Sequence, residues 1–248
     1  MAINFGNGAY GAGYAEVPQR EDNDPRPYDT LANLERLVNS SFTILDVGCG
    51  TAYKTLPLAS KCSHFYGLEP STPLLEKARM GAQGVNNVDF MSGKADQLPF
   101  SNDCLDLVIS LLSPHDAKEA YRVLKPGGIF YLEKVGERDK LNLKQEFGSD
   151  DQGLRGYNCK MVLGERLEII KTEFLASGFT LIDAHNIFYN CYYPTIDDFI
   201  FLLEEVNFTV RNFSREKDKD ILQQIKQKYM TDRGIATQKH EIVVIGRK

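Results

Sequence analysis

Residues 42–51, Phe-Thr-Ile-Leu-Asp-Val-Gly-Cys-Gly-Thr, decide the fold that this chain is expected to adopt. The apolar run over 42–47, interrupted by one aspartate, is typical of a buried strand. Two glycines separated by one small residue follow at once, and they allow a sharp turn close to a ligand. Apolar residues with helical spacing come next, so the stretch predicts a strand, a tight turn and a helix.

A second strand is expected over 64–68, and it ends on Glu69. In open parallel sheets, ligands bind outside the carboxyl ends of the strands, where an acidic side chain hydrogen-bonds a ribose. The dinucleotide fingerprint requires a third glycine at a position that is occupied here by Tyr53. The turn therefore suits a nucleoside without phosphates better. A purely structural glycine turn in another α/β protein stays an alternative.

Strands and helices alternate along the rest of the chain. Further strands are expected at 88–91, 103–110, 129–132, 179–193 and 241–245, and helices at 31–38, 72–78, 117–124 and 167–175. Such alternation forces right-handed parallel crossovers. We therefore expect an α/β, Rossmann-like, doubly wound and mainly parallel seven-stranded sheet, with an antiparallel final strand and a helical insertion before it. The expected domains are an arm and helix over 1–41, a central domain over 42–193 and 239–248, and an insertion over 194–238.

Two motifs resemble those of class I S-adenosylmethionine-dependent methyltransferases, in particular the type 11 or UbiE-like group that acts on small molecules. The first is Leu-Asp-Val-Gly-Cys-Gly-Thr over 45–51, followed by an acid at the end of the next strand. The second is Arg-Val-Leu-Lys-Pro-Gly-Gly over 122–128, directly before a strand. Ala52 stands where that family most often has a third glycine, and alanine fits there if the backbone keeps a negative φ.

The resemblance implies an S-adenosylmethionine site, with S-adenosylhomocysteine as product. Asp46 and the two glycines of the turn would hold the methionine end, Glu69 the ribose hydroxyls, and Ala95 with Asp96 the adenine. Leu111 and Leu112 would form the floor of the pocket. The implied cofactor residues are Tyr28, Asp46, Gly48, Cys49, Gly50, Thr51, Glu69, Pro70, Ala95, Asp96, Gln97, Leu111 and Leu112.

The loop after the fourth strand lies where this family places its methyl acceptor. His115 in that loop is the candidate catalytic residue, as a base or as a group that orients the acceptor. An ordinary loop histidine is the alternative. The loop lacks an Asn-Pro-Pro-Tyr type motif and a Pro-Cys nucleophile, so we expect neither planar-amide methylation nor covalent cytosine chemistry. Cys49 is expected to be a small side chain within the turn.

Composition restricts the classes of partner. The net charge of −5 over 248 residues gives no support to broad capture of nucleic acid. Five scattered cysteines favour reduced thiols, and no residue spacing indicates a metal. No segment is long and apolar enough for a membrane span. We expect a cytoplasmic monomer or homodimer acting on a small-molecule acceptor.

Two segments allow both a functional and a structural interpretation. Residues 1–27 are rich in glycine and aromatic side chains, and they form either a flap over the ligand or a flexible terminus. Residues 194–238 form either a substrate cover or a structural decoration. Three alternatives to a small-molecule enzyme stay open: an RNA methyltransferase, a non-catalytic cofactor-binding module that acts through a partner, and a nicotinamide oxidoreductase, against which Tyr53 argues.

Overall fold

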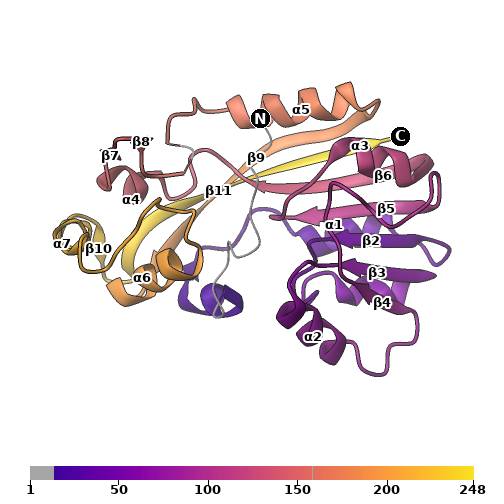
Figure 1. Ribbon diagram of the computed structural model, residues 1–248, viewed down its shortest axis with the longest axis horizontal. Coiled ribbons are helices and arrows are strands. Elements are labelled where there is room, and N and C mark those ends of the chain that lie inside the picture. Colours follow the sequence, from indigo (N-terminus) through magenta and orange to yellow (C-terminus); the bar gives the residue numbers. More distant parts are fainter. Residues whose placement is uncertain (1–13, 158) are drawn as a thin grey trace. The chain divides into compact units, whose positions relative to one another are not determined.

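A central β-sheet places the glycine turn at the end of one of its inner strands, β2 (Figure 1). The protein is described by a computed structural model that covers residues 14–157 and 159–248. Within these ranges the sheet has nine strands in the order β1-β9-β11-β6-β5-β2-β3-β4, with β10 paired to β11. The strands of this sheet are β1 (Asp22–Asn23), β2 (Thr43–Val47), β3 (His64–Leu68), β4 (Val88–Met91), β5 (Leu105–Leu111), β6 (Leu124–Val135), β9 (Thr180–Tyr193), β10 (Met230–Thr231) and β11 (Gly234–Arg247).

Helices and one small hairpin complete the described part of the chain. The hairpin pairs β7 (Ser149–Asp150) with β8 (Gly153–Leu154). Two segments are 3₁₀ helices, η1 (Tyr14–Arg20) and η2 (Leu56–Lys61). The α-helices are α1 (Thr30–Leu37), α2 (Thr72–Gly81), α3 (Ala117–Val123), α4 (Leu141–Glu146), α5 (Glu165–Ala176), α6 (Ile196–Glu205) and α7 (Lys219–Tyr229).

The predicted fold class is confirmed. Neighbouring pairs among β4, β3, β2, β5 and β6 are all parallel. Apart from the two-residue strands β1 and β10, the sheet has the seven expected strands, and it is mainly parallel with an antiparallel strand. The chain crosses from β4 on one edge to β5 on the far side of β2. That reversal of strand order is where open sheets of this kind bind ligands.

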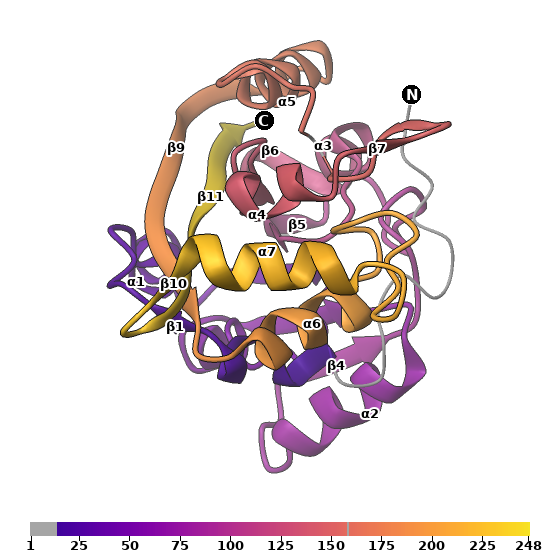
Figure 2. The same cartoon turned by 90° about the vertical axis from the view of Figure 1, so that its left-hand side faces the viewer.

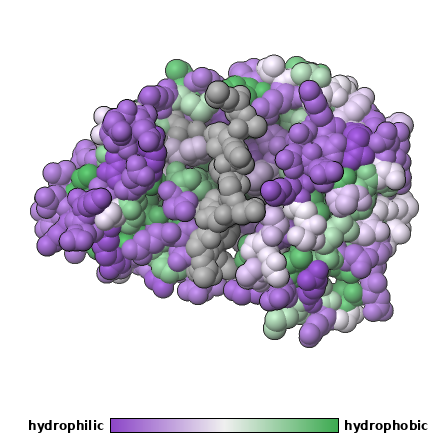
Figure 3. Space-filling view, in the orientation of Figure 1, coloured by the Kyte–Doolittle hydropathy of each residue, from purple (hydrophilic) through white to green (hydrophobic). Residues whose placement is uncertain are grey.

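The chain divides into two compact units. The first, called here the sheet unit, comprises Tyr28–Lys134, Leu167–His185 and Ile242–Lys248. The second unit comprises 14–27, 135–166 and 186–241, within the described ranges. This grouping differs from the expected domain boundaries, because 135–166 and 186–193 belong with the expected insertion. Figure 3 shows hydrophilic side chains over much of the visible surface of each unit.

The core of the sheet unit lies against one face of the sheet. Successive side chains of a strand point to opposite faces, so Leu45 and Val47 share a face with Phe130. They pack there with α3 and α5, where Phe130 stacks on Phe174 at a centroid distance of 4.9 Å. Asp46 occupies the opposite face. The apolar core and the buried acid Asp46 therefore lie on opposite faces of the sheet.

The second unit has a core of its own. It joins α6 and α7 to residues of η1, α4, β9 and β11, and Figure 2 shows both helices. A capping box at Thr195 and Asp198 begins α6. The helical segment expected before the last strand thus contains two helices, α6 and α7. The aromatic arm at residues 1–13 lies outside the described residues.

The segment after the turn differs from its expected form. We predicted a helix there, and the structure has the six-residue 3₁₀ helix η2. Its last carbonyl groups bond the side chain of Asn87, whose Nδ2 donates to Ala59 O at 2.8 Å and to Cys62 O at 3.1 Å. Pro57 lies in the first turn of η2 and has no N–H to donate. A distant side chain therefore ends this element before an α-helix can develop.

Candidate functional site

The turn after β2 requires glycine for steric reasons. Gly48 has φ +70°, and a Cβ at that position would lie 2.4 Å from Ser113 Cβ. Its N–H donates to Leu68 O at 2.7 Å, which ties the turn to the end of β3. Gly50 also has a positive φ, of +57°. The two glycines thus let the backbone bend back against the loop that follows β5.

Ala52 takes a conformation that we did not expect. Its φ is +57°, and its side chain is buried. The condition that we gave for alanine to fit at this position, a negative φ, is therefore not met. The left-handed conformation places the Ala52 N–H where it donates to Cys49 O at 2.8 Å. The turn keeps the shape that a third glycine would give, at a steric cost of about 1–2 kcal/mol for a residue with a Cβ.

Asp46 is a buried acid with one unsatisfied oxygen. Its Oδ2 accepts a hydrogen bond of 2.5 Å from Thr55 Oγ1, whereas Oδ1 is buried and has no hydrogen-bond partner among the described residues. Burial raises the pKa of Asp46 to about 7; the Thr55 hydrogen bond opposes this rise, and the nearby Glu69 charge adds to it. A buried acceptor without a donor is costly. A cationic ligand group at this point would satisfy it.

Glu69 joins the ends of two strands. Its Oε2 accepts from Gly50 N at 3.0 Å and its Oε1 from Ser71 N at 2.9 Å. Burial raises the pKa of Glu69, and the two backbone N–H groups partly offset that rise. A carboxylate offers about four lone-pair sites. The two oxygens can therefore keep these backbone bonds and still accept hydrogen bonds from a ribose diol.

Cys49 is a packed side chain within the turn, as expected. Its Sγ faces Gly67 of β3, where a Cβ would lie only 2.9 Å away. Burial raises the pKa of the Cys49 thiol strongly, and the charges of Asp46 and Glu69 add to the rise. The thiol is therefore a poor nucleophile. Thr51 lies partly buried in the same turn, and Pro70 is exposed after Glu69.

The expected adenine loop forms a tight turn. Lys94 and Gln97 form an isolated antiparallel bridge, which leaves Ala95 and Asp96 at the tip. Ala95 packs against the sheet-unit core, and Asp96 is exposed. A hydrogen bond anchors the loop to α3, because Leu98 N donates to Glu119 Oε2 at 2.8 Å. Ala95, Asp96 and Gln97 thus stay together on a supported loop at the carboxyl end of β4.

The loop after β5 meets the glycine turn through a serine that we did not single out. Ser113 Oγ donates to Val47 O at 2.6 Å and lies 2.9 Å from Ser110 Oγ. Leu112 has φ +55°, and its N–H donates to Glu133 O at 2.9 Å. Leu111 ends β5 directly before it. The floor expected from Leu111 and Leu112 therefore lies beside the turn.

His115 lies on the apolar side of the sheet. Its ring is 6.2 Å from the ring of Phe130, and its Nε2 is 3.3 Å from Glu173 Oε2 on α5. It also lines a cavity of about 10 Å³ together with Val47 and Ala95. Asp46 projects from the other face. A catalytic role for His115 stays a prediction, and these contacts give it no further support.

Tyr28 belongs to a hydroxyl network at the end of β6 that the sequence did not reveal. The Tyr131 hydroxyl lies 3.1 Å from the Tyr28 hydroxyl and 3.1 Å from Glu133 Oε1. Thr30 Oγ1 donates to the same Glu133 oxygen at 2.5 Å. Tyr28 also packs against His185 at a centroid distance of 5.1 Å. The only available signal was the polar side chain of Glu133 at the end of an apolar strand.

Comparisons with known proteins agree with this geometry. A family model described as a methyltransferase domain matches residues 44–128, which run from β2 to the start of β6. The malonyl-[acyl-carrier protein] O-methyltransferase of Methylococcus capsulatus is 25% identical over 234 residues, covering 90% of this chain and 80% of that protein. Residues 44–128 therefore carry a methyltransferase domain, and that domain resembles those of the class I S-adenosylmethionine-dependent methyltransferases.

Two further comparisons show how much of this methyltransferase is similar to other proteins. The biotin biosynthesis bifunctional protein BioHC of Cellvibrio japonicus is 30% identical over 142 residues, which span 50% of this chain and only 28% of that protein. The solved structure of the YcgJ protein from Bacillus subtilis has a TM-score of 0.62 at 20% identity, covering 88% of this chain and 97% of that one. The structural likeness shows the fold alone.

The residues present fit the cofactor of the methyltransferase family. The unpartnered Asp46 oxygen suits the ammonium group of the methionine end, and Glu69 has acceptor capacity for a ribose. No cluster of potential metal ligands occurs among the described residues. Within the same ranges, no helix combines the length and apolar character needed to cross a bilayer.

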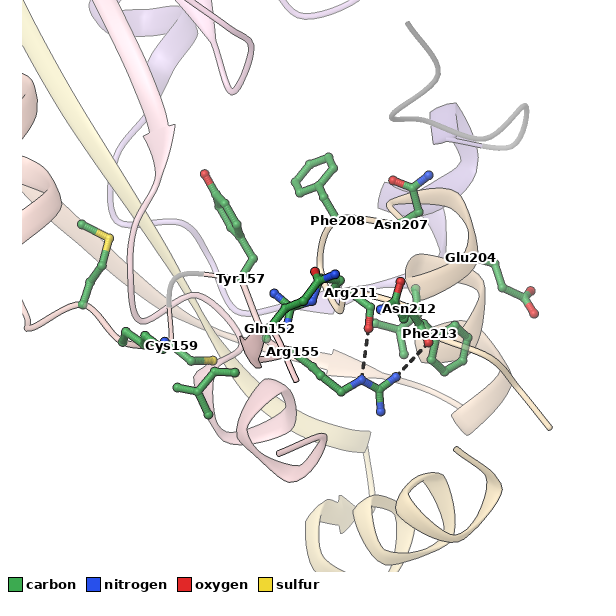
Figure 4. Close-up of a pocket in the computed structure, with 15 residues that line it drawn as sticks. Gln152, Arg155, Tyr157, Cys159, Glu204, Asn207, Phe208, Arg211, Asn212 and Phe213 are labelled. Carbon is green, nitrogen blue, oxygen red and sulfur yellow. Dashed lines mark hydrogen bonds between the residues drawn. The ribbon is translucent and has the colours of Figure 1, made fainter. Parts of the chain in front are cut away.

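A larger pocket, of about 990 Å³, lies in the second unit (Figure 4). Arg155 spans its base, where Nε donates to Arg211 O at 3.1 Å and Nη1 to Asp218 Oδ1 at 2.7 Å. Arg211 in turn pairs with Asp150. Both guanidinium groups are thus committed to holding this unit together. The pocket shares no lining residue with the cofactor site.

Proposed function

We propose that this methyltransferase transfers the methyl group of S-adenosylmethionine to a nitrogen, oxygen or sulfur atom of a small molecule. One observation carries the proposal: the buried Asp46 keeps an unpartnered oxygen in a turn that Glu69, whose charge acts on Asp46, ties down through Gly50 N. When bound, S-adenosylmethionine supplies a methyl group on a positively charged sulfur. The chain would hold its two polar ends with two acids on neighbouring strands.

The other expected contacts fit the same orientation. Ala95 and Asp96 would meet the adenine, because their turn follows β4 at the edge beyond β3. Leu111 and Leu112 would lie under the opposite end, since β5 is on the other side of β2. Holding the methyl group in line with an acceptor supplies most of the rate enhancement for a nucleophile that is already reactive.

A small-molecule acceptor is supported better than RNA. Three of the six basic residues of α7 and the loop before it are paired with acids: Arg211 with Asp150, Lys228 with Glu146, and Arg215 with Asp197. Paired cations do not make the basic face that binds phosphates. The name of the Methylococcus relative places its acceptor on a carrier protein. We propose a cytoplasmic monomer or homodimer, consistent with five free thiols.

The first test of this proposal is the affinity for S-adenosylhomocysteine. Glu69→Gln replaces one acceptor oxygen by a donor, so it leaves part of a ribose diol unmatched and also breaks one backbone bond. We expect a loss of affinity of about 10- to 100-fold, the effect of leaving a buried polar group unpaired. Calorimetric titration measures it. Glu76→Gln, an exposed substitution on α2, is the matched control and should bind like the wild type.

Unchanged binding by the folded Glu69→Gln variant would contradict the ribose assignment. Binding of NAD in place of S-adenosylhomocysteine by the wild type would contradict the proposed function itself. Transfer of a labelled methyl group to a metabolite extract, followed by identification of the labelled product, would then identify the acceptor. Binding without any transfer would favour a non-catalytic module.

A further inference from the structure

The carboxyl edge of the sheet carries a third buried acid, which the cofactor contacts above do not use. Glu133 is 4% exposed and lies two residues before the end of β6. The strand register aligns Glu133 with the glycine turn. Leu111 pairs with Glu133, and Asp46 pairs with Ile109, which is two residues before Leu111. Gly48 is therefore level with Leu111. A single row crosses the edge, from Glu69 through Gly48 and Leu111 to Glu133.

This row has the two acids at its ends. Val47 pairs with Leu68, so Glu69 is level with Gly48. Neighbouring strands lie about 4.8 Å apart, so three strand spacings separate Glu69 from Glu133 by roughly 14 Å. Alternation puts Asp46, Tyr131 and Glu133 on the same face. A ligand whose ribose meets Glu69 and whose adenine lies beyond β3 would extend its other end across β2 toward Glu133.

Hydroxyl groups hold the Glu133 carboxylate in place. Thr30 Oγ1 donates to Oε1, and the Tyr131 hydroxyl lies 3.1 Å from the same atom. The Tyr131 hydroxyl is also 3.1 Å from the Tyr28 hydroxyl, so its single proton is shared between Glu133 and Tyr28 as possible acceptors. Burial and the Glu133 charge raise the pKa of Tyr131, which keeps that phenol protonated. The network fixes the position of the Glu133 side chain.

We propose that Glu133 is the acceptor-side carboxylate of this site and that the acceptor atom is a hydroxyl or amine that gives up a proton. This inference rests on the proposed function. As the acceptor atom forms its bond to the methyl carbon, the electron pair of the broken carbon–sulfur bond stays on sulfur, and the acceptor's proton passes to Glu133. An acceptor that is already an anion, such as a carboxylate, would be repelled by a buried acid.

Two ligands that differ only at the methyl position test the placement of Glu133. S-adenosylhomocysteine has a neutral sulfur there, whereas sinefungin has a carbon bearing a protonated amine. If Glu133 faces that position, the wild type should bind sinefungin at least about tenfold more tightly, because a cation gains from a nearby carboxylate. Glu133→Gln should remove this preference and leave the affinity for S-adenosylhomocysteine within about twofold. Glu76→Gln changes the net charge equally and should keep the preference.

Each other outcome has a definite meaning. A wild type that binds both ligands equally overturns the inference, whether or not Glu133→Gln folds. Equal weakening of both ligands by Glu133→Gln also overturns it, since the acid would then serve the methionine end or the fold. No binding of either ligand to the wild type would instead contradict the proposed function. Calorimetric titration supplies all of these affinities.

Discussion

At the scale of single residues, the site depends on acids that are buried before any ligand arrives. Asp46 lies among apolar strand residues and has one oxygen without a donor. Glu69 is similarly buried, but two backbone N–H groups satisfy it. The unfolded chain would solvate both acids fully. The folded protein therefore bears an electrostatic cost at Asp46, which a cationic ligand can recover.

This cost predicts how stability depends on pH. With its pKa raised to about 7, folded Asp46 keeps a proton that the unfolded chain releases near pH 4. Stability from this residue is therefore greatest at low pH and falls as pH rises toward 7. Asp46→Asn cannot ionise, so between pH 5 and pH 8 it should gain about 2–3 kcal/mol relative to the wild type. Urea unfolding at both pH values measures the difference, and a constant difference would contradict the raised pKa.

Sequence patterns identified the residues that backbone geometry dictates. The glycines of the turn and the acid after β3 were predictable, because a sharp turn and a strand end leave a clear pattern. Ala52 was not, since a positive φ in alanine has no signal in a single sequence. Glu133 and Ser113 were missed for another reason. Their roles arise from tertiary contacts between residues more than sixty positions apart in the chain, Ser113 with Val47 and Glu133 with Thr30.

At the scale of elements, η2 shows how a distant side chain sets local structure. Its sequence has apolar spacing that suits an α-helix, and Asn87 before β4 instead bonds its last carbonyl groups. The sequence therefore predicted that a helix follows the turn, but it did not predict that this helix is a 3₁₀ helix. The limits of the strands were also predicted incompletely: β11 begins at Gly234, whereas the strand was expected only from residue 241.

The Asn87 contacts predict a measurable cost. Asn87→Ala removes the side-chain donor to two partly buried carbonyl groups, Ala59 O and Cys62 O. We expect a loss of about 1–3 kcal/mol in the free energy of unfolding. Asn86→Ala is the matched control, since Asn86 is the adjacent residue and is exposed, and it should change stability by less than about 0.5 kcal/mol. Equal effects of the two substitutions, measured by urea unfolding, would contradict the role assigned to Asn87.

At the scale of the whole molecule, the chain forms two units that each have an apolar core. Every residue assigned here to cofactor binding lies in the sheet unit. The second unit has instead a buried ion pair between Arg155 and Asp218. The Asp218 carboxylate accepts hydrogen bonds from Arg155 Nη1 at 2.7 Å and Nη2 at 2.9 Å, and also from Ser214 N. Because each unit has its own core, we expect that loss of this ion pair destabilises the second unit and leaves the sheet unit unchanged.

Asp218→Asn tests that prediction. It leaves the Arg155 charge uncompensated in a largely buried position, and we expect a loss of about 2–4 kcal/mol in the stability of the second unit. Hydrogen exchange should therefore accelerate in 135–157 and 186–241, whereas protection of β2, β3 and β5 should not change. Affinity for S-adenosylhomocysteine should stay within about twofold of the wild type. Asp220→Asn, an exposed substitution two residues along the same chain segment, should alter neither quantity. Faster exchange throughout the sheet, together with weaker binding, would show that the two units open as one and that the cofactor site depends on both.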